Sequence, residues 1–180
     1  MRTFLRRTSK RSGFTLLEVI VTASVLLVGL LAMTSTSVVV NSLRRSASDL
    51  QRAQQAMQVL VEDLHAAARE ADDDASAWAA DVLSLYGPGG TPGDSFTVDG
   101  LDPWEGETDV AFINLVTDET TTDAALGVAL GMPRDLDGNG SATNTDVSGS
   151  ASILPAVIRL QWSGSAGPQQ LTQVIYLLRF

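Results

Sequence analysis

The residues best suited to chemistry lie in a short polar segment, residues 135–146, where oxygen-bearing side chains recur at alternate positions. Counted from Asp135, oxygen donors fall at positions 1, 3, 5, 9 and 12 with glycine at position 6, and the expected ligands are Asp135, Asp137, Asn139, Ser141, Thr143 and Asp146. Ca²⁺ takes about six to eight hard oxygen ligands, and this is the spacing of an EF-hand-type loop. The segment therefore predicts a Ca²⁺ site, in which Ser141 contributes its backbone carbonyl.

Two features of this segment leave an alternative open. Position 12 is Asp146 rather than the longer glutamate, and residues 147–150 do not begin a helix. The alternative is a turn cluster of Asp, Asn and Gly that holds no metal. Extracellular modules bind Ca²⁺ with dissociation constants of about 10⁻⁴–10⁻³ M, so a weak site would still be filled outside the cell.

Glu18 is the second chemically informative residue, because it lies inside an apolar segment that runs from Phe14 to about Val40. A charge within a membrane segment costs roughly 2.5–3.5 kcal/mol on insertion scales, so it normally has a function. A helix of this length reaches about 40 Å, more than the roughly 30 Å hydrocarbon core. No acid precedes the segment, but five basic residues do: Arg2, Arg6, Arg7, Lys10 and Arg11. This asymmetry predicts a single span with its N-terminus inside and its C-terminus outside.

The run from Gly13 to Val19 (GFTLLEV) follows this basic leader and opens the membrane-length segment. It resembles the class III signal of type IV pilins and of the pseudopilins of type II secretion systems. The resemblance implies that a prepilin peptidase cuts after Gly13, that the new N-terminal Phe14 is N-methylated, and that Glu18 takes part in assembly. An ordinary signal peptide or a plain membrane anchor is the alternative, but no small-residue cleavage site follows the apolar run.

The same resemblance implies a structural subunit rather than an enzyme. Its partners would be the prepilin peptidase, other pilins or pseudopilins, an inner-membrane assembly platform and membrane lipid. It would reside in the bacterial inner membrane with its head in the periplasm, and then in a pilus or pseudopilus. Residues 96–101 and the Trp-ended final hairpin look like minor pilins of the PilV-like group. The second hypothesis is a monomeric, membrane-anchored extracytoplasmic module that binds Ca²⁺ or a partner.

Beyond the membrane segment, apolar side chains recur at helical spacing. They lie seven residues apart, at Leu43, Leu50, Met57, Leu64 and Ala71. Neither proline nor glycine interrupts residues 30–86, so we expect one continuous helix from Phe14 to about Glu70. Its membrane half would be bare and its outer half would pack under a head domain, which is the pilin-like ladle. A free coiled-coil stalk is the alternative.

The remaining residues predict an acidic α+β head. A second helix is expected over residues 76–85, with Trp78, Val82 and Leu85 on its buried side, and short strands over residues 96–98 and 109–116. Residues 153–162 and 171–180 alternate as strands and predict an antiparallel hairpin with a six-residue loop. The organisation is therefore a leader (1–13), a transmembrane and assembly helix (14–40), an amphipathic helix that packs on the head (41–71) and the head domain (72–180).

Composition excludes several classes of function. The chain has 12 basic and 21 acidic side chains; loss of the five basic leader residues leaves 7 − 21 = −14. Such a charge repels phosphate backbones, so we expect no direct nucleic-acid binding. There is no cysteine to form a disulfide, and His65 is the only histidine. The sequence contains neither a nucleophile elbow nor a phosphate-binding loop, so no enzymatic activity is predicted.

Overall fold

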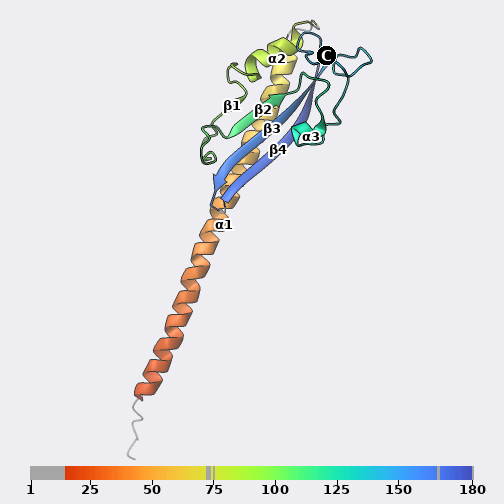
Figure 1. The fold of residues 1–180 in the computed structure, drawn as a ribbon. Helices are drawn as coiled ribbons and strands as arrows, with labels where there is room; N and C mark the ends of the chain where they lie inside the picture. Colours follow the sequence, from red (N-terminus) through yellow and green to blue (C-terminus); the bar gives the residue numbers. More distant parts are fainter. Residues whose placement is uncertain (1–14, 72–73, 75, 166, 180) are drawn as a thin grey trace, which may run out of the picture. The chain divides into compact units, whose positions relative to one another are not determined.

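A computed structural model describes residues 15–71, 74, 76–165 and 167–179 (Figure 1). The basic leader, Gly13, Phe14 and two of the three aspartates that follow the long helix lie outside the described residues. The elements are α1 (Leu16–Glu70), α2 (Trp78–Tyr86), β1 (Ser95–Phe96), β2 (Ala111–Leu115), α3 (Asp123–Leu126), β3 (Ile153–Gly164) and β4 (Gly167–Leu178). One long helix followed by a small antiparallel sheet confirms the predicted α+β, pilin-like fold.

Helix α1 crosses the boundary between two compact units, Met1–Ser42 and Leu43–Phe180. In the first unit, the large apolar side chains from Leu16 to Val40 are exposed. Neither Gly29 nor the Ser/Thr run at residues 34–37 interrupts the helix. The hydroxyls of Thr22, Ser24 and residues 34–36 donate to carbonyls three or four residues earlier. Such internal bonds satisfy polar groups that would find no water in a membrane.

In the second unit, α1 buries one stripe against the sheet and α2. The stripe consists of small and long apolar side chains at helical spacing: Ala53, Met57, Leu60, Leu64, Ala67 and Ala68. The predicted stripe began too early, because Leu43 and Leu50 are 64% and 43% exposed. A seven-residue repeat defines a face of a helix, whereas burial begins only where another element covers that face.

The sheet has the order β1-β2-β3-β4, and every neighbouring pair is antiparallel. The C-terminal hairpin is longer than predicted: Ser163 pairs with Pro168 and Gly164 with Gly167, so the connection is residues 165–166 rather than six residues. Glycine and proline in residues 163–168 indicated a turn correctly, but strand pairing continues through most of them. Gly167 adopts a φ of 111°, which lets the chain reverse within so short a connection.

Helix α2 covers the end of α1 and is held there by Trp78. This side chain is 1% exposed, and its Nε1 donates a 2.8 Å hydrogen bond to the carbonyl of Ala68 in the last turn of α1. A carbonyl in the last turn has no partner within its own helix, so the indole satisfies it. Val82 is buried as predicted, but Leu85 is 41% exposed and Tyr86 takes the inward position.

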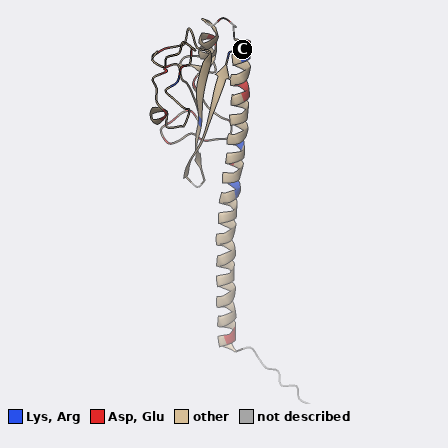
Figure 2. Cartoon of the chain, turned by 90° about the vertical axis from the view of Figure 1, so that its right-hand side faces the viewer, with Lys and Arg blue, Asp and Glu red and all other residues tan. Residues whose placement is uncertain are grey.

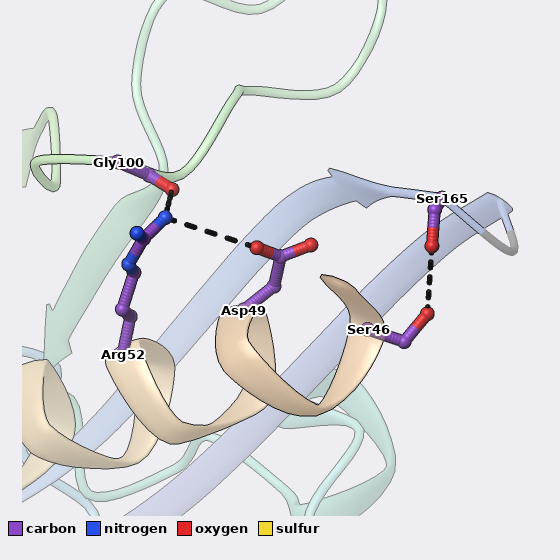
Figure 3. A network of polar contacts seen from close by, with 5 residues as sticks. All are labelled: Ser46, Asp49, Arg52, Gly100 and Ser165. Atoms are coloured by element: carbon purple, nitrogen blue, oxygen red, sulfur yellow. Dashed lines mark hydrogen bonds and ion pairs between the residues drawn. The ribbon is translucent and has the colours of Figure 1, made fainter. Parts of the chain in front are cut away.

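Polar contacts join the earlier part of the outer α1 helix to the head (Figure 3). Arg52 donates to the carbonyl of Gly100 at 2.9 Å and lies 3.9 Å from Asp49. Ser46 and Ser165 share a 2.8 Å hydrogen bond, which places the hairpin turn beside α1. Strands β3 and β4 therefore lie along the helix from this turn to the buried stripe.

Candidate functional sites: the start of the long helix and an acidic loop

The start of α1 is organised by Thr15 and Glu18. The backbone N–H of Glu18 donates to the carbonyl and to Oγ1 of Thr15, at 3.0 and 3.3 Å. A threonine followed three residues later by glutamate is the sequence of a capping box, in which the hydroxyl satisfies a free N–H of the first turn. The Thr-x-x-Glu spacing is visible in the sequence, so this cap could have been predicted from it. Glu18 therefore belongs both to the cap and to the motif of residues 13–19.

Glu18 is the first charge of the described helix, and the next is Arg44 (Figure 2). Its carboxylate lies in the first turn, where a negative charge interacts favourably with the helix dipole. The apolar residues between these two charges make α1 long and apolar enough to cross a membrane. The helix therefore carries a carboxylate at the start of an otherwise uncharged, exposed and membrane-length segment.

In the acidic loop, Asp135 is the residue around which the backbone turns. Its carboxylate accepts hydrogen bonds from the N–H groups of Gly138, Asn139 and Gly140, at 2.7, 3.2 and 2.7 Å. These bonds, that of Gly140 most of all, hold the pKa of Asp135 below its ordinary value. Gly140, the predicted turn glycine at position 6, has a φ of 90°, a value that side-chain-bearing residues rarely adopt.

The structure adds a carboxylate that sequence reasoning missed. Oxygen atoms of Glu119, Asp135 and Asp137 lie within 4.8 Å of one another. Glu119 is fully buried, and it accepts from the N–H groups of Leu136 and Asp137 through Oε1 and of Asn144 through Oε2. It lies outside the loop in sequence, and no spacing rule links it to Asp135. Glu119 follows β2 in the chain, and only the tertiary fold brings it beside the loop.

The other predicted ligands occupy different places. Asn139 donates its side-chain amide to Asp137 Oδ2 at 2.9 Å, and so does Asn144, which was not a predicted ligand, at 2.8 Å. Ser141 and Thr143 share a hydrogen bond between their hydroxyls at 3.0 Å. Asp146 is not part of the three-carboxylate group; its Oδ1 accepts from the N–H of Ser148 at 2.9 Å, which lowers its pKa. Each carboxylate oxygen has two lone pairs, so an oxygen that accepts one N–H can still bind a cation.

Comparison with known families supports the interpretation of the N-terminal residues as a pilin-type signal. The family model for the prokaryotic N-terminal methylation motif matches residues 8–34, which include Gly13, Phe14 and Glu18. No curated protein and no solved structure matches the chain.

This motif is the class III signal of type IV pilins and pseudopilins, and its match over residues 8–34 supports the resemblance of the chain to that family. The family is structural rather than enzymatic. The motif implies processing by a prepilin peptidase and assembly with other pilins, and the apolar start of α1 fits anchoring in a membrane.

Proposed function

We propose that this protein is a minor pilin or pseudopilin, assembled into a type IV pilus or a type II secretion pseudopilus after cleavage between Gly13 and Phe14. The observation that carries the proposal is Glu18, a carboxylate that belongs to the matched motif and lies in the first turn of an exposed apolar helix. A plain anchor would gain nothing from a charge at this place, because a charge raises the free energy of membrane insertion.

Glu18 would act by pairing with the positive α-amino group of Phe14 on a neighbouring subunit. An ion pair is much stronger in a medium of low dielectric constant than in water, and an unpaired carboxylate there is costly. Pairing would therefore draw each new subunit into register. We expect Glu18→Ala to leave cleavage intact but to impair incorporation into filaments; normal incorporation of this variant would contradict the mechanism.

The experiment that tests the proposal is the intact mass and the N-terminal residue of the protein, taken separately from membranes and from fibres sheared off cells. N-methylated Phe14 in the sheared fraction would support a pilus subunit. The same processed form confined to membranes would support a pseudopilin. An intact leader in both fractions would overturn the proposal and favour the anchored binding module.

We propose, as a second property, that the acidic loop binds Ca²⁺. The specific observation is that Glu119, Asp135 and Asp137 gather three carboxylates within 4.8 Å, one of them fully buried. Within the described part of the chain, none of these three acids forms an ion pair with an arginine. A divalent cation would offset their mutual repulsion and supply the hard charge that oxygen ligands prefer. Asn139, Ser141, Thr143 and Asp146 remain predicted ligands.

A further inference from the structure

Strand β4 is an unprotected edge of the sheet. It pairs with β3 on one side, and in the described part of the chain no further strand follows it in the sheet order. Natural edge strands usually carry charged residues, prolines or bulges that prevent pairing with another chain. From Gly167 to Leu178, β4 has no charged residue, and its one proline, Pro168, lies at the beginning beside the turn. Residues 169–178 therefore present an uninterrupted edge without charge.

The hydrogen bonds of β3 show which backbone groups of β4 point outward. The carbonyl of Pro155 accepts from the N–H of Val116, and the N–H groups of Gln161 and Ser163 donate to the carbonyls of Val110 and Asp102. The odd-numbered residues of β3 therefore face the β2 side. The even-numbered residues of β3 therefore face β4, where the register pairs them with odd-numbered residues. The N–H and C=O groups of the even-numbered residues 170, 172 and 174 must point away from the sheet. Among the described residues, no backbone bond outside the sheet's own ladders reaches them.

The opposite edge of the sheet is also free of charge over its paired residues. Phe96 and Asp94 accept through their carbonyls from the N–H groups of Val110 and Ile113, so these two residues face β2. Ser95 and Thr97 consequently direct their backbone groups outward. Residues 95–98 carry no charge, and the acidic residue that precedes them is Asp94.

Strand direction allows these two edges to meet in neighbouring copies. All copies anchored in one membrane share one orientation, a step that rests on the function proposed above. The sheet has four strands that alternate in direction, so β1 of a copy in the same orientation runs antiparallel to β4. Two β4 edges cannot pair antiparallel between such copies, because their strands run the same way. The alternation therefore selects β1 as the partner of β4.

We propose that the β4 edge of one subunit pairs with the β1 edge of the next copy of this chain and continues the sheet between them. Two heads of net negative charge repel each other, but neither paired edge contributes to that repulsion. In this arrangement Asp94 lies toward the C-terminal end of β4. That end borders a hollow lined by His65, Arg69 and Tyr176, and the positive charge of Arg69 complements the carboxylate.

Cysteine cross-linking of the full-length protein in membranes tests this contact, because the chain has no native cysteine. The outward groups of the two edges can pair in more than one register, and the register that centres residues 95–98 on β4 places Thr97 opposite Thr172. Cα atoms opposite each other in such a pair lie about 5.5 Å apart, within disulfide range. Within one subunit, β1 and β4 are separated by three strand spacings, roughly 14 Å, which no disulfide spans. Every disulfide in Thr97→Cys/Thr172→Cys is therefore intermolecular.

On oxidation of the membranes, we expect the double variant to form a ladder of dimers, trimers and longer species, and each single variant to remain monomeric. Ser95→Cys/Val174→Cys lies in the same register and should give the same ladder. The matched control is Thr145→Cys/Thr172→Cys, since Thr145 is exposed but outside both edges.

Dimers from Thr172→Cys alone would overturn the proposal, because they require two β4 edges to meet. Equal cross-linking of the control, or no ladder from either edge pair, would also overturn it. The N-terminal mass of the same sample reports the proposed function separately: processed protein without a ladder refutes only the edge contact, and an uncleaved leader refutes the filament subunit.

Discussion

Calcium should stabilise the head through the three-carboxylate group, and Asp137→Asn should remove that effect. Oxygens of Glu119, Asp135 and Asp137 lie within 4.8 Å of one another, so a bound ion would contact all three. With a dissociation constant of about 0.1–1 mM and about 5 mM Ca²⁺, binding adds RT ln(1 + [L]/Kd), or about 1–2.3 kcal/mol. For a domain of this size, that is a rise in melting temperature of roughly 3–10 °C.

The assay is thermal unfolding of a soluble fragment of residues 41–180, followed by circular dichroism with Ca²⁺, with Mg²⁺ and with a chelator. The matched control is Asp99→Asn, which removes the same charge from an exposed residue outside the group. We expect the control to keep the Ca²⁺ shift and Asp137→Asn to lose it. Equal shifts in both variants would mean that Ca²⁺ only screens an acidic surface, and no shift in the parent fragment would refute the site.

Three further predictions concern packing, acid stability and assembly. Trp78→Phe leaves a buried carbonyl without a donor and a smaller ring in the core, so urea should show a loss of about 3 kcal/mol in the free energy of unfolding. The control Trp104→Phe, at a half-buried position, should cost under about 1 kcal/mol. Equal losses would contradict the capping role of Trp78. The N–H of Met132, with those of Leu130 and Gly131, lowers the pKa of Asp123 below its usual 3.8. The stability that ionised Asp123 contributes is therefore present above that pH and is lost as the pH falls through the lower folded value. Between about pH 6 and pH 2 the melting temperature of Asp123→Asn should fall less steeply than that of the parent protein, and parallel curves would count against this assignment. Glu18→Gln keeps the shape of the side chain but not its charge, so the sheared-fibre fraction should contain less of this variant than of Glu18→Asp, whereas equal amounts would argue against ion pairing.

Local sequence rules predicted the helices and the hairpin because neighbouring residues determine them. The absence of proline and glycine from residues 30–70 kept α1 continuous to Glu70, and the alternation of Ile158, Leu160 and Trp162 predicted the buried face of β3. The same rules misplaced Leu85 and made the hairpin loop too long. Both errors concern residues at the end of an element, where contacts with other elements decide how far the regular pattern extends.

The sequence by itself determined the N-terminal part of this protein, because the methylation motif, the position of Glu18 and the membrane-length apolar segment depend on the order of residues along the chain alone. The donor spacing of residues 135–146 was equally readable. Only the tertiary structure placed the buried Glu119 beside Asp135 and Asp137, and only the sheet order revealed two uncharged edges in antiparallel relation. The physical reason is that such sites join residues distant in sequence, and their proximity follows from how strands pair and loops return, which no local pattern records.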